Sequence, residues 1–134
     1  MQAARELVPY SIVIADDNRS CRDDLRALLE PEGYKLHLAA SGEDALDLLE
    51  RMSIHLLLCD MQMPKLTGLE TVRLAHVRDD KLPCILVTAE RDEGLIRQAL
   101  AERVYSVLSK PVSRAELLYT TSRALAKTYG PLSN

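Results

Sequence analysis

The stretch "HLLLCDMQMP", His55 to Pro64, contains an apolar run that ends in a carboxylate. Residues 56–59 are the kind that lie in a protein interior, yet Asp60 follows them at once. An unpaired carboxylate at the edge of a core is costly, and a chain leaving a buried strand could turn on Gly or Asn instead. Asp60 therefore either caps a turn or takes part in the chemistry of the protein.

The composition is that of an ordinary single domain. The chain has 134 residues, of which 47% are hydrophobic and 28% charged. A formal net charge of -3, with Lys and Arg scattered along the chain, disfavours direct binding to nucleic acid. No apolar run approaches the roughly 20 residues of a membrane helix, and the N-terminus lacks a signal-peptide pattern. We expect a cytoplasmic protein that does not insert into membranes, with Cys21, Cys59 and Cys84 as free thiols.

Five short segments have the character of strands. Three are continuous apolar runs between polar or turn residues, as in strands buried on both faces. Two mix apolar and polar residues, which is typical of strands at the edges of a sheet. The buried segments are 11–15, 55–59 and 84–88, and the mixed ones are 35–39 and 105–109. In the first mixed segment, Leu36 and Leu38 are expected to face the core.

Amphipathic helical patterns lie between these strands. Apolar residues recur at helical spacing in five segments. They lie around 21–29, 45–52, 69–75, 95–100 and 117–125. Ser41 with Asp44, and Ser113 with Glu116, have the spacing of helix N-terminal caps, and "PEG" at 31–33 should end the first helix.

Strands that alternate with helices imply right-handed crossovers and a parallel sheet covered on both faces. If the two mixed strands are the edges, the strand order is 2-1-3-4-5. This is the flavodoxin-like doubly wound α/β arrangement, which binds ligands beyond the carboxyl ends of strands 1 and 3. The residues that follow the strands are therefore the candidate site.

Polar residues follow four of the predicted strands and should converge on one edge of the sheet. They are Asp16-Asp17, Asp60, Thr88 and Lys110-Pro111. Each alone could cap a helix or turn, or be solvated. Their joint appearance favours a functional site, because capping does not require three carboxylates in neighbouring loops with a lysine opposite.

Three carboxylates within a few ångströms repel by about 4 kcal/mol per pair at ~4 Å and an effective dielectric constant near 20. A hard divalent cation would offset this repulsion, and Mg²⁺ suits a site with few carboxylates. Zinc is disfavoured because Cys59 should point away from Asp60 and the histidines lack ligand spacing. A carboxylate beside Mg²⁺ can accept a phosphoryl group as an acyl phosphate, with Lys110 and the Thr88 hydroxyl holding its oxygens.

From about Tyr10 to Tyr129 the sequence resembles the two-component response regulator receiver (CheY-like) domains. The matching motifs are the acidic pair 16–17, "DMQMP" at 60–64, Gly68, Thr88-Ala89 and Lys110-Pro111. The resemblance implies that Asp60 is the phosphoacceptor and that Lys110 pairs with the phosphate. It also implies that Asp17, Asp60 and the Gln62 backbone carbonyl bind Mg²⁺, with Asp16 helping through water. A cis Lys110-Pro111 peptide is implied as well.

The resemblance also implies partners and an organisation. A histidine kinase or phosphotransfer protein would supply the phosphoryl group, and the surface of the fourth helix, fifth strand and fifth helix would contact a downstream effector. The protein would not be an enzyme beyond Mg²⁺-dependent self-phosphorylation and autodephosphorylation. We expect the receiver domain at 10–129, with tails at 1–9 and 130–134. Only "TYGPLSN" follows the last helix, so we expect either a stand-alone receiver or a fragment of a longer regulator.

The switch and tuning residues depart in part from the family pattern. Thr88 and the neighbouring Ala89 match the switch, but its aromatic partner is replaced by Val107. Tyr105 is expected on the same side of the strand as Val107 and could substitute for the aromatic, although its ring would start about 6–7 Å away from Val107 along the strand. Arg103 replaces a turn glycine common in relatives, so the fourth helix is expected to end differently. Gln62 and Glu90 occupy the positions that tune dephosphorylation, and their polarity predicts a moderately short-lived acyl phosphate.

Two other functions fit parts of the pattern. A haloacid-dehalogenase-type phosphohydrolase would need a second Asp two residues after its nucleophile, but Arg19 follows Asp17 and Gln62 follows Asp60 at that spacing. A phosphorylation-independent interaction module on the same fold would be expected to lack some of the five site residues, all of which are present. The receiver interpretation is therefore favoured.

Overall fold

The computed structural model describes residues 9–130, which form a five-stranded parallel sheet between two helical layers. The strand order β2-β1-β3-β4-β5 confirms the predicted flavodoxin-like fold. The strands are β1 (Ser11–Ala15), β2 (Lys35–Ala39), β3 (Leu56–Asp60), β4 (Cys84–Thr88) and β5 (Ser106–Ser109). The helices are α1 (Arg19–Leu29), the short 3₁₀ helix η2 (Glu30–Glu32), α2 (Gly42–Arg51), α3 (Gly68–Arg78), α4 (Glu93–Ala101) and α5 (Arg114–Tyr129). Within the described residues, every helix is too short or too polar to span a bilayer.

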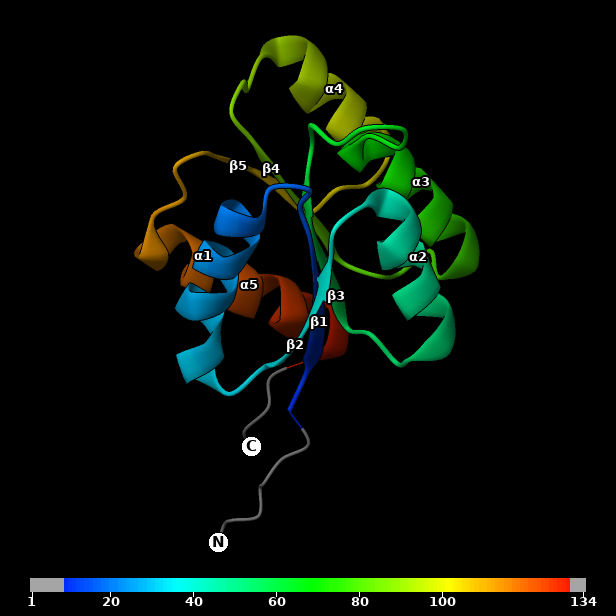
Figure 1. Cartoon of the computed structure of the whole chain (residues 1–134). Coiled ribbons are helices and arrows are strands. Elements are labelled where there is room, and N and C mark those ends of the chain that lie inside the picture. The colour runs from blue at the N-terminus through cyan, green and yellow to red at the C-terminus, as the bar shows by residue number, and fades with distance from the viewer. Residues whose placement is uncertain (1–8, 131–134) are drawn as a thin grey trace, which may run out of the picture.

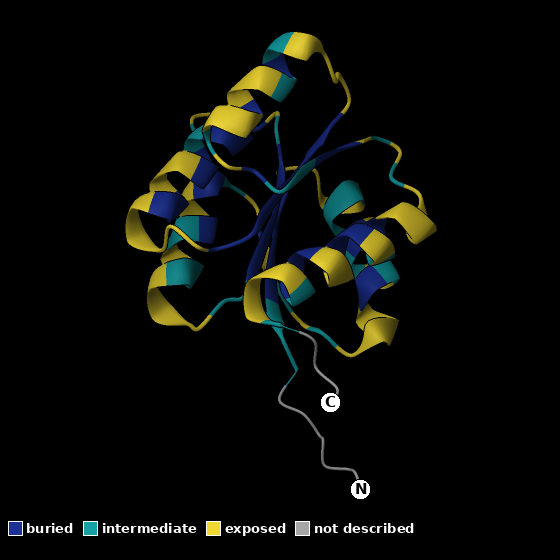
Figure 2. Cartoon of the chain, turned by 180° about the vertical axis from the view of Figure 1, so that it is seen from behind, coloured by how far each residue is buried: buried dark blue, intermediate teal, exposed yellow. Residues whose placement is uncertain are grey.

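The two faces of the sheet are covered by different helices. Figure 1 shows α1 and α5 on one side and α2, α3 and α4 on the other. Alternation along β1 divides the core accordingly: Ile12 and Ile14 pack toward α1 and α5, whereas Val13 and Ala15 pack toward the other three helices. The central strands are buried on both faces, and exposed residues lie on the outer helix surfaces (Figure 2). The continuous apolar runs in the sequence result from this double coverage.

The helix caps leave the candidate site residues free for other roles. Asn18 caps α1 by accepting a hydrogen bond from the Cys21 N–H at 2.9 Å, and Asp92 caps α4 in the same way. Ser41 and Ser113 cap α2 and α5, as their spacing predicts. Neither Asp17 nor Thr88 is needed as a helix cap, which removes one of the ordinary explanations for these residues.

One side chain and two strand starts differ from the sequence-based expectations. Leu38, expected to face the core, is 38% exposed, while Leu36 packs against the cluster beneath α1 and α5. β3 begins at Leu56 instead of His55, and β5 begins at Ser106, so Tyr105 precedes the strand. An edge strand has a neighbour on one side only, and alternation therefore predicts burial less well there than in central strands.

The end of α4 keeps the geometry that a glycine would favour, although the residue there is arginine. Arg103 has φ of 59°, in the left-handed region, and its N–H donates to the Leu100 carbonyl at 3.0 Å. The Val104 N–H donates to the Ala99 carbonyl at 2.9 Å. These two bonds form a Schellman motif. The expectation that the arginine changes how the helix ends is therefore not met in the backbone.

Candidate functional site

The carboxyl ends of the strands bring the predicted polar residues together. Asp16 is fully buried after β1, and Asp60, the last residue of β3, is only 4% exposed. The Lys110 ammonium lies 3.1 Å from Asp60 Oδ1 and 3.2 Å from Asp16 Oδ2. One lysine therefore links two buried carboxylates whose loops are far apart in the sequence. The lysine is followed by a cis peptide to Pro111, as the resemblance implied.

Both oxygens of the Asp16 carboxylate already have protein partners. Oδ1 accepts a hydrogen bond from the Asn18 N–H at 2.9 Å, while Oδ2 faces Lys110. The Arg22 guanidinium donates to the Asp16 backbone carbonyl at 2.7 Å. Asp16 is thus held from α1 as well as from the loop after β5, and its position is more constrained than that of Asp17, which is exposed. No signal in the sequence identified Arg22 as part of the site, because it belongs to the polar face of α1.

The acidic residues fit a divalent cation. One carboxylate oxygen from each of Asp16, Asp17 and Asp60 lies within 4.8 Å of the other two. Asp60 Oδ1 is buried and, among the described residues, no donor is aligned to hydrogen-bond it, although the Lys110 ammonium is close enough for an ion pair. Three carboxylates against one ammonium leave an excess of negative charge. Hard oxygen ligands with such an excess are the donors that Mg²⁺ takes.

An open hollow of about 410 Å³ lies over this acidic cluster. Its walls include Asp17, Asp60 and Lys110, together with Gln62 and Ala89–Glu90 from the loops after β3 and β4. The hollow is accessible from solvent and large enough for a phosphoryl group. Asp60 is thus placed at the end of a buried strand and at the floor of an accessible pocket.

Gly68 permits the close approach that sets the Asp60 backbone. A Cβ atom at residue 68 would lie 2.5 Å from the Asp60 carbonyl oxygen and 2.8 Å from the Met61 Cα. The Gly68 N–H donates to the Met61 carbonyl at 2.9 Å, which ties the start of α3 to the end of β3. The glycine in the sequence motif is therefore a packing requirement of this junction.

Burial and neighbouring charges shift the pKa values of the two central groups. Burial, and then the Asp16 charge, raises the pKa of Asp60, and Lys110 opposes the shift. Burial lowers the pKa of Lys110, but its ion pairs with the Asp60 and Asp16 carboxylates outweigh this effect and raise the pKa above the ordinary value. Lys110 is therefore a cation at neutral pH, and part of the carboxylate repulsion at Asp60 remains.

Thr88 is not part of the acidic cluster but lies beside the hollow above it. Its side chain is buried, and its hydroxyl oxygen accepts from the Glu90 N–H at 3.1 Å. The hydroxyl lies 3.4 Å from Gln62 Oε1 and 3.3 Å from the Glu90 carbonyl, either of which can accept its proton. The three residues form a small network beside the hollow. Gln62 and Glu90 are both exposed.

The predicted substitute for the missing aromatic is wrongly placed. Val107 is buried in the cluster beneath α2, α3 and α4. Tyr105 packs instead against the cluster on the opposite face, and the Lys127 ammonium lies 5.9 Å from its ring centroid. Because Tyr105 precedes β5, the strand alternation that would align it with Val107 does not reach it.

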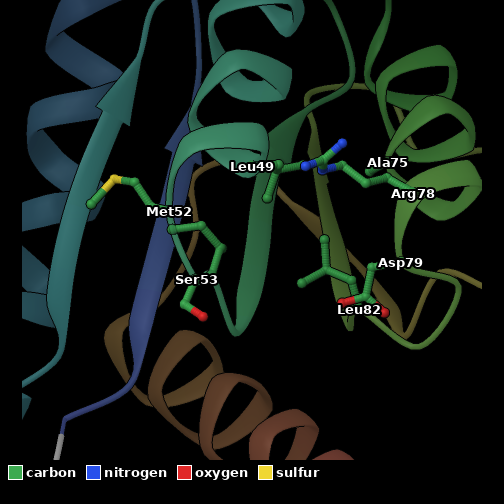
Figure 3. Close-up of a pocket in the computed structure, with 8 residues that line it drawn as sticks. Leu49, Met52, Ser53, Ala75, Arg78, Asp79 and Leu82 are labelled. Carbon is green, nitrogen blue, oxygen red and sulfur yellow. The ribbon is translucent and has the colours of Figure 1, made fainter.

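A larger hollow, of about 550 Å³, lies at the start of β3, away from the acidic cluster. Figure 3 shows its lining, which includes Leu49 and Met52 at the end of α2 and Leu82 in the loop between α3 and β4. Arg78 at its rim pairs with Glu50 at 3.6 Å. Among the described residues that line it there is no cluster of potential metal ligands, so the acidic edge remains the candidate site.

The fold and this edge define a doubly wound α/β protein with a carboxylate cluster at its topological switch point. The family model described as "Response regulator receiver domain" matches residues 12–122. The chain therefore belongs to the response regulator receiver family, whose members are not enzymes in the ordinary sense. This confirms the family identified from the sequence.

Comparisons with individual proteins also indicate the receiver family. The chain is 34% identical over 131 residues to "Response regulator MprA" of Mycobacterium sp. (strain KMS), covering 92% of this chain and 54% of that protein. A CheY-like response regulator receiver domain protein from Methanospirillum hungatei JF-1 superposes with a TM-score of 0.86 at 26% identity, over 90% of this chain and 97% of that one. The signal receiver domain of an HD domain-containing protein from Pseudomonas fluorescens Pf-5 gives a TM-score of 0.87 at 29% identity, over 92% and 100%. The chain spans about half the length of the curated relatives it matches.

Proposed function

We propose that Asp60 accepts a phosphoryl group from a histidine kinase or a histidine phosphotransfer protein. The observation that carries this proposal is a carboxylate at the floor of an open hollow, paired with Lys110 and beside two further carboxylates. An Asp60 oxygen attacks phosphorus, the bond between phosphorus and the donor imidazole nitrogen breaks, and the imidazole takes up a proton. The product is an acyl phosphate on Asp60.

The protein supplies position and charge for this reaction. Lys110 is held by two carboxylates, so its ammonium is fixed where it can contact a phosphoryl oxygen on Asp60. The Thr88 hydroxyl is available to donate to the phosphoryl group after releasing its contact with Gln62 or Glu90. Both interactions strengthen as negative charge accumulates on the transferred group.

Asp17, Asp60 and the Gln62 backbone carbonyl would hold Mg²⁺, and Asp16 would act through a bound water because both of its oxygens already have partners. The ion would neutralise the charge of the carboxylates and phosphoryl oxygens. Asp60 Oδ1 is buried without an aligned donor, and Asp17 is exposed, so a carboxylate oxygen of each remains available as a ligand.

Partners and turnover complete the proposal. The phosphoryl donor approaches the hollow over Asp60, and a downstream effector contacts the surface of α4, β5 and α5. These events take place in the cytoplasm, within the receiver domain 10–129 expected from the sequence.

Gln62 and Glu90 are exposed beside the hollow and can orient a water molecule toward the acyl phosphate. A Gln62→Leu variant should then lose its phosphoryl group more slowly than the wild type, and an unchanged decay rate would remove Gln62 from the mechanism.

Intact-protein mass spectrometry tests the phosphoacceptor directly. The protein is incubated with acetyl phosphate with and without MgCl₂, beside Asp60→Asn. We expect one added phosphoryl group that requires Mg²⁺ and is missing from the variant. Multiple turnover of acetyl phosphate would instead favour a phosphohydrolase. An unmodified protein that still binds its partners would favour the phosphorylation-independent module.

A further inference from the structure

A third hollow, of about 520 Å³, lies among the C-terminal ends of α3, α4 and α5. We call it the basal hollow and define it by Lys81, Leu100, Arg103, Tyr105 and Lys127 in its lining. It opens near the start of β5, whereas Asp60 stands at the opposite end of the parallel strands. It is thus separate from the acidic site and forms the far end of the surface of α4, β5 and α5, so a partner bound there rests on the effector contact proposed above.

Three cations from three different segments converge on the basal hollow. Lys81 comes from the loop before β4, Arg103 from the turn after α4 and Lys127 from the last turn of α5. All three are exposed, and none forms an ion pair within residues 9–130. Asp80 is the one carboxylate that residues 9–130 contribute to the lining, and its backbone carbonyl, not its side chain, accepts from Arg103 at 3.3 Å. The hollow is therefore net positive in a protein with a formal net charge of -3.

An apolar surface lies between these cations. Leu100 belongs to the helical apolar pattern around residues 95–100, and such a pattern favours burial, yet Leu100 is 69% exposed at the hollow. Val104 and Pro83 are buried in the floor, and Tyr105 forms a wall with Lys127 over its ring. Apolar and aromatic groups ringed by unpaired charges are typical of a protein-binding surface.

Stabilisation of helix ends does not explain all of these cations. A cation near a helix C-terminus interacts favourably with the helix dipole, which accounts for Lys127. Arg103, however, occupies a left-handed position where a side chain costs about 1–2 kcal/mol relative to glycine. A side chain held in an uncommon backbone conformation, at a position where glycine would be unstrained, points to a role for that side chain. The hollow of Figure 3 provides the contrast, because its rim cation Arg78 is already paired with Glu50.

We infer that the basal hollow binds a segment of a partner protein in which an apolar side chain is flanked by carboxylates. The apolar side chain packs on Leu100 and Tyr105, while the carboxylates pair with Arg103, Lys127 and Lys81. Charge complementarity selects this occupant: a basic or neutral segment would leave the cations unpaired and repelled or desolvated. The binding does not depend on the phosphorylation of Asp60.

The test uses synthetic peptides and amide chemical shifts. The probe carries Leu-Phe between two pairs of glutamates; one control peptide has lysines for the glutamates, and another has Ser-Ser for Leu-Phe. We expect the acidic probe to cause saturable shifts at residues 80–83, 99–105 and 126–128. Both control peptides should bind at least about 10-fold more weakly. Asp60→Asn should bind the probe like the wild type, which separates this inference from the proposed phosphorylation.

Charge reversals locate the binding. The double variant Arg103→Glu with Lys127→Glu should weaken probe binding by about 10-fold or more. The matched control, Arg97→Glu with Arg123→Glu, makes the same charge change on α4 and α5 but outside the hollow, and should change binding by less than about 3-fold. Arg103→Gly, which keeps the turn geometry, should also weaken binding. Equal losses in the two double variants would reduce the effect to net charge and overturn the inference. Complete displacement of the probe by inorganic phosphate would overturn it too, since the hollow would then be a small-anion site.

Discussion

Replacing Gly68 with alanine should disturb both the stability of the protein and the phosphoacceptor. The added Cβ would lie 2.5 Å from the Asp60 carbonyl oxygen, and ordinary contacts begin at 3.4 Å, so the start of α3 and the end of β3 must separate by about 0.9 Å. Overpacking of this kind costs about 1–3 kcal/mol. Alanine gains at most about 1 kcal/mol over glycine in a helix, and less in its first turn. We expect a net loss of about 1–2 kcal/mol in the free energy of unfolding.

The same displacement should slow phosphorylation, because a shift near 1 Å at a reacting group can reduce the rate by about 10²-fold. Gly94→Ala is the matched control: it also lies in the first turn of a helix, and its added Cβ would meet only Asp92 Oδ1, at 3.3 Å. Urea unfolding gives the stabilities, and the rate of acetyl phosphate labelling with Mg²⁺ gives the reactivity. Gly94→Ala should stay within about 0.5 kcal/mol of the wild type in stability and label at the same rate. If Gly68→Ala behaves like Gly94→Ala in both assays, the close approach does not position Asp60.

Three further predictions concern other parts of the molecule. Lys110→Met leaves two buried carboxylates without their cation and should destabilise the metal-free protein by about 3 kcal/mol. In an Asp60→Asn background the loss should be smaller by at least about 1 kcal/mol, because one of the two ion pairs is already absent. Strictly additive losses in urea unfolding would contradict the shared ion pair. Arg103→Gly relieves a left-handed backbone conformation at φ of 59° and should stabilise the protein by about 0.5–1 kcal/mol, so a lower denaturation midpoint would argue against strain there. Burial lowers the pKa of His55, whose Nδ1 accepts from the Ser11 N–H at 2.9 Å, so the unfolded chain binds more protons than the folded one. The free energy of unfolding should therefore fall as the pH drops from about 6.5 toward the folded-state pKa. An NMR titration midpoint for His55 at or above about 6.5 would refute this.

The sequence was sufficient for the fold because two independent patterns agreed. Continuous apolar runs identified the three central strands, and mixed composition identified the two edges, which together leave one doubly wound strand order. Parallel strands carry their following residues to a common edge, so Asp16, Asp60 and Lys110 could be grouped before any distance was known. Local hydrogen bonding by Ser41 and Ser113 is similarly readable, since a cap contacts residues only three positions away.

Tertiary structure alone decided the features that depend on what covers a residue. Leu38 and Leu100 follow the periodicity of buried residues but are exposed, because periodicity predicts the direction of a side chain and not the presence of a neighbour. Tyr105 lies just outside β5, so it packs on the opposite face from Val107. The partners of Asp16 and the convergence of Lys81, Arg103 and Lys127 likewise arise between segments distant in sequence. Local periodicity and strand topology are written along the chain, whereas the charge and exposure of each position are set by whichever distant segments fold against it.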